Sequence, residues 1–259
     1  MQQRLLAAAW LGRVDYETAW AWQHELFMAR LDGDRGDSVV LLEHPPTYTL
    51  GRRTVPEDLV YGVRERATKG ISLFKVDRGG RATYHGPGQL VGYPILALGE
   101  RYDVLAYLRR LEEVVIATAA DLGVEARRDD EHTGVWVGRN KIAAIGVRIT
   151  RGITMHGFAL NVTTDLSMFE GIVPCGIEDH WVTSVKAETG RAHPVKEVAA
   201  LAASHLARVF DRPLVWVHPS SLIVDETEGP RHHARVTQAH EAVATRSWGT
   251  EPAGVRRKR

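Results

Sequence analysis

The chain has 259 residues, of which 44% are hydrophobic and 25% are charged, and its formal net charge is +1 at pH 7. This composition is that of an ordinary globular protein and gives no support for a nucleic-acid or membrane-surface partner. A single cysteine excludes an internal disulfide framework and a multi-cysteine zinc site, and it fits a reducing cytoplasm. No apolar run approaches the roughly 20 residues that a membrane-spanning helix needs.

The first part of the chain alternates between strand and helix signals. Residues 5–11 predict a strand rather than a signal peptide, because no convincing small-residue cleavage site follows them. Asp15 is expected to cap a helix. A buried strand over 38–43 is stopped by residues 44–46, a loop follows over 47–53, and a short helix begins at Pro56. The buried stripe of the first helix, apolar except for Gln23, comprises Tyr16, Ala19, Trp20, Gln23, Phe27 and Leu31.

The rest of the chain is rich in strand signals around two long helices. The clearest helix covers 103–122, where Gly123 ends the pattern, and the second covers 195–210. The expected buried face of the first of these comprises Val104, Leu105, Leu108, Leu111, Val115, Ile116 and Ala119. Strands are expected at 74–76, 82–85, 89–98, 124–128, 133–137, 141–149, 153–162 and 182–185, with one helical turn over 165–169.

Strands outnumber helices, and the helices interrupt the strand runs. This order predicts an α/β (α+β) fold with a mixed, mainly antiparallel sheet flanked by helices. We expect residues 1–219 to form one domain. Residues 220–259 are polar and weakly periodic, which indicates a flexible tail. Three tail histidines (His232, His233 and His240) are poor metal candidates because no cysteine accompanies them, and no metal site is expected.

Cys175 and Lys141 are the candidates for covalent chemistry. Cys175 lies between a proline and a glycine, which indicates a thiol presented on a loop. A small buried hydrophobe is the ordinary alternative for a free cysteine. Lys141 interrupts a largely apolar strand; a nearby ammonium would favour the thiolate of a cysteine, whose thiol otherwise has a pKa of about 8.5. Lys141 could also end a hairpin and point to water, and a histidine could replace it as base.

A glycine-rich segment over 78–89 is the third candidate. It has neither the dinucleotide-binding spacing nor that of a phosphate loop. Its small residues would let a long ligand lie against the main chain, and His85 could hydrogen-bond near the reaction centre, although a structural histidine is the commoner case. The strand segments 144–146 and 156–160 are small and apolar, so they could line an acyl channel or simply form sheet core.

Together these segments resemble the octanoyl-[acyl-carrier-protein]:protein octanoyltransferases, also called lipoyl(octanoyl) transferases, of lipoate biosynthesis. The resemblance runs from about residue 5 to 215, and the tail beyond Pro219 lies outside it. The matching residues are Asp15-Tyr16, residues 43–51, Arg78-Gly79-Gly80-Arg81-Ala82-Thr83-Tyr84-His85-Gly86-Pro87-Gly88-Gln89, Lys141-Ile142-Ala143-Ala144-Ile145-Gly146, His156-Gly157-Phe158-Ala159-Leu160-Asn161 and Pro174-Cys175-Gly176.

The resemblance implies a catalytic domain similar to the biotin and lipoate protein ligases. It implies Cys175 as the acyl-thioester nucleophile and Lys141 as its partner, with no cofactor. Octanoyl-acyl carrier protein would be the donor. Lipoyl domains of 2-oxoacid dehydrogenase complexes and the glycine cleavage H protein would be the acceptors. The implied substrate-binding residues are Arg78, Gly79, Gly80, Arg81, Ala82, Thr83, Tyr84, His85, Ala144, Ile145, Gly146, Gly157, Phe158 and Ala159.

Two other functions are compatible with these segments. An ATP-dependent lipoate or biotin protein ligase would share the fold and a lysine but would need no cysteine. A non-catalytic module could hold acyl carrier protein or an acyl chain.

Because acyl carrier protein is acidic, a positive rim is also expected beside the pocket, formed by Arg52, Arg53, Arg78, Arg81, Arg148 and Arg151.

Overall fold

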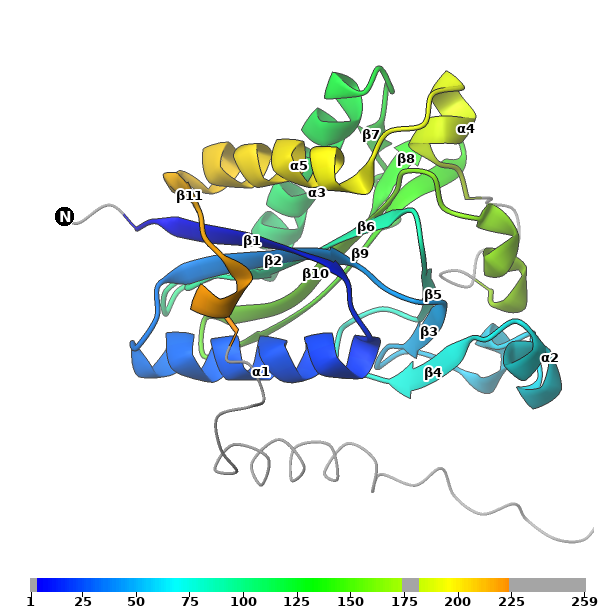
Figure 1. Cartoon of the computed structure of the whole chain (residues 1–259), viewed down its shortest axis with the longest axis horizontal. Helices are drawn as coiled ribbons and strands as arrows, with labels where there is room; N and C mark the ends of the chain where they lie inside the picture. Colours follow the sequence, from blue (N-terminus) through cyan, green and yellow to red (C-terminus); the bar gives the residue numbers. More distant parts are fainter. Residues whose placement is uncertain (1–3, 174–181, 224–259) are drawn as a thin grey trace, which may run out of the picture. The chain divides into compact units, whose positions relative to one another are not determined.

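A large mixed sheet organises the computed structural model, which describes residues 4–173 and 182–223 (Figure 1). Within these residues the sheet has eight strands, and the part from β2 to β7 is antiparallel, whereas β1 pairs in parallel with both β2 and β11. The mainly antiparallel α/β prediction is therefore confirmed. The strand order is β11 (Leu214–Trp216), β1 (Leu6–Arg13), β2 (Asp37–Glu43), β6 (Gln89–Ile95), β10 (Ile153–Asn161), β9 (Asn140–Thr150), β8 (Val135–Val137) and β7 (Arg127–Arg128).

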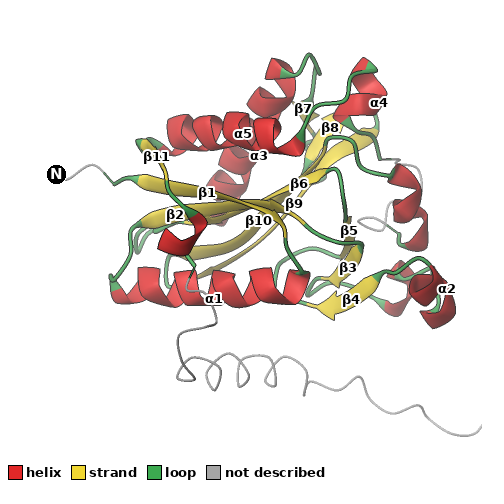
Figure 2. Ribbon diagram, viewed as in Figure 1, coloured by secondary structure: helices red, strands yellow, loops and turns green. Residues whose placement is uncertain are grey.

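Helices cover both faces of this sheet (Figure 2). On one face α3 (Val104–Asp121) and α5 (Val195–Phe210) pack together over a cluster that includes Leu41, Leu111 and Leu206. On the other face α1 (Tyr16–Asp32) packs against β6 and β10. Because helices cover both faces, β2, β6 and β10 are buried along nearly their whole length rather than at alternate residues. Within the described residues no helix combines the length and apolarity needed to cross a membrane.

A second, smaller sheet lies beside the large one. In the described part of the chain it has three strands in the order β4 (Ser72–Lys75), β3 (Thr47–Leu50) and β5 (Ala82–His85). Its core includes Tyr48, Tyr84 and Phe169, the last from the 3-10 helix η2 (Leu166–Gly171). Two short helices precede β4, namely η1 (Pro56–Asp58) and α2 (Val63–Thr68).

Residues 47–50 correct the sequence prediction, which placed a loop there. They form β3, with Thr47 opposite His85 and Tyr48 opposite Tyr84. Threonine and tyrosine suit a pleated, half-buried surface, and the two prolines before them end the preceding strand without preventing a new one. This strand carries Thr49 beneath the glycine-rich segment.

Helix α3 corrects a second prediction. Val104 and Leu105, expected on the buried face, are 46% and 58% exposed, because they lie in the first turn, where the Asp103 carboxylate caps the helix. Leu111 is fully buried, as predicted. The buried face also contains residues that the prediction omitted: Tyr107, Glu112, Val114 and Thr118.

The structure also differs from the sequence prediction at smaller points. Asp15 stands at the start of α1 but makes no side-chain capping bond. The expected strand over 182–185 is a single bridge at Val182, after which the helix α4 (Val185–Thr189) begins. Strand β11 and the short 3-10 helix η4 (Pro219–Ser221) were not predicted. The elements over 82–85 and 195–210 match their predicted bounds, and residues 224–259 of the expected tail lie outside the described residues.

His44, directly after β2, is a fully buried polar residue. Its Nδ1 donates to the Val14 carbonyl at 2.7 Å, so its Nε2 is left to accept from the Tyr93 hydroxyl at 2.8 Å. Burial lowers the pKa of His44 to about 4, despite the opposing effect of the bond to Val14. His44 is therefore an uncharged structural link between β2, β6 and the start of α1.

Replacing Leu111 by alanine should destabilise the fold by about 2–5 kcal/mol, because the cavity left under α3 cannot be filled by solvent. Leu105→Ala on the same helix is the matched control and should change the free energy of unfolding by less than about 0.5 kcal/mol. Denaturant titrations of both variants measure the difference, and equal losses would contradict the assigned helix face.

The protein should lose stability as the pH falls below the ordinary histidine pKa of 6.5. Between 6.5 and about 4 the unfolded chain binds a proton at His44 that the folded chain does not, so about 2 kcal/mol is lost between pH 7 and pH 5 through this residue. His44→Gln should flatten the pH dependence of the unfolding free energy by that amount, whereas His218→Gln, at an exposed position, should not. Parallel curves for His44→Gln and the unmodified protein would refute this assignment.

Candidate active site

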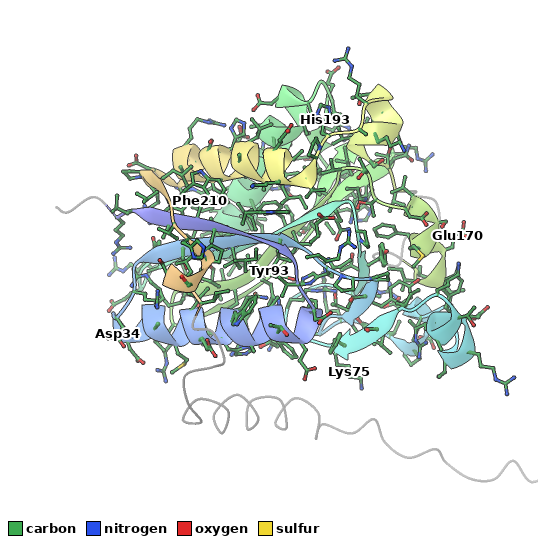
Figure 3. All side chains as sticks on the ribbon, viewed as in Figure 1. Asp34, Lys75, Tyr93, Glu170, His193 and Phe210 are labelled. Carbon is green, nitrogen blue, oxygen red and sulfur yellow. The ribbon has the colours of Figure 1, made fainter. Side chains whose placement is uncertain are left out.

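A cavity of about 460 Å³ opens where β9 and β10 meet the small sheet. Its walls come from α1, β5, β6, β9 and β10 and from the loops over 78–81 and 131–133. Tyr93 of β6, which lines it, lies in the interior of the fold (Figure 3). The sequence-predicted residues that line it are Arg78, Gly80, Arg81, Ala82, Thr83, His85, Lys141, Ala144, Ile145, Gly146, Gly157, Phe158 and Ala159.

Two of the predicted substrate residues do not line this cavity. Tyr84 alternates to the opposite face of β5, where its ring packs edge-on against Tyr48 and Phe169. Burial raises the pKa of Tyr84 to about 12. Gly79 instead donates its main-chain N–H to the Val147 carbonyl at 2.9 Å, which ties the glycine-rich loop to β9. Both residues support the wall from behind.

Lys141 lies at the start of β9 and is 6% exposed. Its Nζ donates to the Thr133 carbonyl at 3.2 Å and stands 4.5 Å from the centroid of the Trp136 ring. The ring face attracts the ammonium, so this contact and the Thr133 carbonyl both favour a lysine on the cavity wall. A lysine that merely ended a hairpin in water would not be buried in this way.

The predicted nucleophile, Cys175, lies in segment 174–181, outside the described residues. The chain on either side is fixed. Before the segment, Val173 donates its N–H to the Asp58 carbonyl at 2.9 Å. After it, Val182 lines the cavity and bridges to Lys141, and Thr183 donates its N–H to the Lys141 carbonyl at 2.9 Å. The chain therefore re-enters the described structure directly beside the candidate lysine.

The wall formed by β9 and β10 is lined by small and apolar residues. Three cross-strand pairs build it: Ala144 with Ala159, Ile145 with Phe158, and Gly146 with Gly157. Gly157 cannot be enlarged, because a Cβ there would lie 2.1 Å from the Gly92 carbonyl oxygen. These pairs leave room along the wall for a narrow apolar chain.

The arginines of the expected positive rim differ in their availability. Arg81 is held by the buried carboxylate of Asp58, and Arg148 pairs with Asp77. Arg78 is 7% exposed and donates to the carbonyls of Thr49, Gly79 and Arg81. Three of the six arginines of the expected rim therefore make bonds within the protein. The exposed members are Arg52, Arg53 and Arg151.

A buried histidine that is hydrogen-bonded to a carboxylate, His156, was not among the predicted site residues. It lines the cavity, and its Nε2 lies 2.7 Å from an oxygen of Asp77, whose other oxygen bonds Arg148. The main-chain φ of His156 is 57°, and the Gln23 side chain accepts its N–H at 2.9 Å. A histidine in this left-handed conformation is strained and must be held by its surroundings. Although burial opposes it, the bond from His156 and the charge of Arg148 hold the pKa of Asp77 below its usual range.

The sequence carried only an indirect signal for this cluster. His156 belongs to a segment that was interpreted as apolar channel wall, and Asp77 directly precedes the glycine-rich segment. Residues in strands that are buried on both faces are usually apolar, so a polar residue there is a candidate for a functional role. The same signal applies to Gln89 and Asn161, which are buried in β6 and β10 and line the cavity.

The chain matches the family model of the lipoyl protein ligase A/B catalytic domain over residues 15–207. It is 52% identical to an octanoyltransferase of Mycobacterium tuberculosis over 204 residues, which cover 78% of this chain and 85% of the relative. It is 48% identical to an octanoyltransferase of Mycobacterium ulcerans over 226 residues, 84% of this chain and 93% of the relative.

Solved structures share the fold at much lower identity. A crystal structure of lipoate-protein ligase A bound with ATP superposes with a TM-score of 0.72 at 19% identity and covers 95% of both chains. A putative lipoate protein ligase from T. acidophilum with bound lipoic acid gives 0.71 at 19% identity, covering 95% of this chain and 98% of that one. The family model and the two mycobacterial relatives together show that this chain belongs to the octanoyltransferases, acyltransferases of the lipoyl protein ligase A/B catalytic-domain family.

Proposed function

We propose that this protein transfers an octanoyl group from octanoyl-acyl carrier protein to a lysine of lipoyl domains, through a thioester on Cys175. The observation that carries the proposal is the buried Lys141 on the wall of the cavity, with Val182 and Thr183 bonded to its main chain. Since Cys175 lies in the segment that leads into Val182, chain connectivity supports a meeting of thiol and amine at this cavity.

In the first step the Cys175 thiolate attacks the thioester carbonyl of the donor. A carbon–sulfur bond to Cys175 forms, the bond to the phosphopantetheine sulfur breaks, and that sulfur leaves as a thiol after taking a proton from the Lys141 ammonium, which becomes a neutral amine. One thioester replaces another, so the step is near balance. An ammonium beside the attacking thiol favours its ionised form, which is the nucleophile. We assign that ammonium to Lys141.

In the second step the acceptor lysine amine attacks the octanoyl thioester. A carbon–nitrogen bond forms, the bond to Cys175 breaks, and neutral Lys141, acting as general base, takes the amine proton, which restores the ammonium beside the Cys175 thiolate. A thioester converts to an amide downhill, so this route needs no ATP. A covalent intermediate divides one difficult transfer between two protein partners into two easier ones.

The cavity suits a narrow apolar acyl group. Its volume of about 460 Å³ falls within the range usual for small-ligand sites, and the paired small residues of β9 and β10 provide a smooth wall. Lipoyl domains of 2-oxoacid dehydrogenase complexes and the glycine cleavage H protein are the proposed acceptors, and the proposed location is the cytoplasm.

ATP-dependent ligation of free octanoate or lipoate is the second candidate, favoured by the likeness to lipoate-protein ligase A bound with ATP. At 19% identity that likeness concerns the fold alone. The two activities separate in one assay that compares octanoyl carrier protein with free octanoate plus ATP as donors. A ligase would use the second pair, and it would survive loss of the sole cysteine.

Mixing the protein with octanoyl carrier protein should add one octanoyl group, which intact-mass spectrometry detects and peptide mapping locates at Cys175. Cys175→Ser should abolish the hydroxylamine-sensitive adduct. Lys141→Met should slow adduct formation by about 100-fold or more, the usual range for a lost acid–base group. Lys186→Met, at an exposed position on α4, is the matched control and should react at the normal rate. A labile octanoyl adduct on the Cys175→Ser variant would refute the scheme.

The exposed arginines beside the cavity should assist docking of the acidic donor. Arg52→Gln combined with Arg53→Gln should raise the KM for the carrier-protein donor about 5-fold at low salt, as two exposed ion pairs of roughly 0.5 kcal/mol each would give. The same change should weaken the salt dependence. Arg64→Gln, an exposed change on α2, controls for net charge. A donor KM that is independent of salt in the unmodified protein would eliminate this role.

A further inference from the structure

A buried glutamine, Gln89, holds a defined orientation under the cavity. It is 1% exposed and lies at the start of β6. Its Nε2 lies 3.0 Å from the Tyr84 carbonyl and 2.9 Å from Oδ1 of Asn161. A carbonyl can only accept, so the bond to Tyr84 fixes which end of the amide is the NH₂ group. The carbonyl end, Oε1, must therefore act as an acceptor.

That acceptor determines the tautomer of His85. Nδ1 of His85 lies 2.9 Å from Oε1 of Gln89, so Nδ1 must carry the proton. Nε2 is then a lone-pair acceptor, and Thr49 Oγ1, at 3.5 Å, is its neighbour. The Arg78 guanidinium in turn donates to Thr49 Oγ1 at 2.8 Å. Donors and acceptors alternate in one direction from Arg78 to Gln89.

The same direction continues to the lysine. Asn161 donates its Nδ2 to the Thr183 carbonyl at 2.9 Å, which fixes its Oδ1 as the acceptor for Gln89. Thr183 donates its N–H to the Lys141 carbonyl. A single hydrogen-bonded chain thus joins the glycine-rich loop to the strand that carries Lys141. His85 lies in the middle of this hydrogen-bonded chain and lines the cavity.

We infer that Gln89 is a positioning residue that keeps His85 in the uncharged Nδ1–H form, so that the cavity can accept an apolar acyl chain beside it. The inference rests on the proposed function for its ligand but not for its geometry. An imidazolium in this wall would have to lose its hydration whenever an acyl chain entered, which costs several kcal/mol for an unpaired charge. Gln89 offers His85 an acceptor without the negative charge that would promote protonation.

The surroundings of His85 act in the same sense. Burial and the nearby His44 lower its pKa well below the ordinary value, although the bond to Gln89 opposes them. The Tyr16 ring stacks on it at 5.9 Å and the His44 ring lies edge-on at 5.6 Å. The titratable or charged groups that face it are Tyr16 from α1, His44 after β2, Arg78 from the glycine-rich loop and His156 from β10.

The tautomer can be measured on the unmodified full-length protein without any substrate. Long-range ¹H–¹⁵N correlation spectra distinguish protonated from unprotonated ring nitrogens, and a His85→Asn variant assigns the signals. We expect Nδ1 protonated and Nε2 unprotonated at pH 7. An Nε2–H tautomer, or a charged ring at pH 7, would overturn the inference whether or not the octanoyl reaction is correct.

Two variants of Gln89 separate charge from packing. Gln89→Met and Gln89→Glu both lose the bonds to Tyr84 and Asn161. Only the glutamate variant introduces a negative charge, which should favour the protonated form of His85. We expect Gln89→Glu to show at least a 10-fold higher KM than Gln89→Met for the octanoyl donor at pH 6.5, and the ratio should fall toward one as the pH rises and the ring loses its proton. A ratio that stays constant with pH would exclude the positioning role. If Gln89→Glu does not fold, the spectra of Gln89→Met, which should lose the fixed tautomer, decide the question.

Discussion

The register between β9 and β10 is the constraint on which the site depends. Side chains alternate between the two faces of a strand, so a slip of one residue would turn every side chain of the slipped strand to the opposite face of the sheet. The observed register places Ala144, Ile145 and Gly146 opposite Ala159, Phe158 and Gly157. Lys141 stands at the start of the same strand, where β8 and Val182 flank it. Lys141 and the apolar wall are thus parts of the same pair of strands, and the strand geometry sets the distance between them.

The cavity combines an apolar wall with a polar base. Its cationic side chains have stabilising partners, whereas two buried histidines beside it are neutral. Lys141 is accommodated by a carbonyl and an aromatic face, and Arg148 by Asp77. His44 and His85 have their pKa values lowered by burial and make hydrogen bonds as neutral rings. Buried polar groups with partners can specify one arrangement of a core, whereas unpartnered ones would destabilise it. The base of the cavity is therefore a hydrogen-bonded network of fixed geometry, and the apolar wall adjoins it.

Local sequence patterns predicted most helices and the strands with strong propensity. The helix over 195–210 and the strand over 82–85 follow from periodicity and punctuating glycines and prolines. The sequence singled out Lys141 and the glycine-rich segment as candidates, and the resemblance implied their roles; Lys141 and most of the segment over 78–85 line the cavity. Pairings distant in sequence could not be found in this way. Examples are the Asp77–His156 contact, the Arg81–Asp58 pair and the parallel pairing of β11 with β1.

The same limit explains the errors in exposure. Val104 and Leu105 have the spacing of a buried face, but both side chains are exposed in the first turn of α3. The arginines around the pocket were expected to form one positive rim because sequence shows charges without their partners. Whether a charged side chain is available depends on a carboxylate that is remote in the chain, as Asp58 is for Arg81.

The parallel pairing of β11 with β1 affects how the chain assembles. Leu6 stands opposite Leu214, so the first strand of the sheet acquires its outer neighbour only after almost all described residues have left the ribosome. Until then β1 presents an unpaired backbone edge, which is a template for pairing with another chain. Contacts of such large sequence separation also form slowly. Aggregation of nascent or truncated chains that end before Leu214 is the corresponding hazard of this topology.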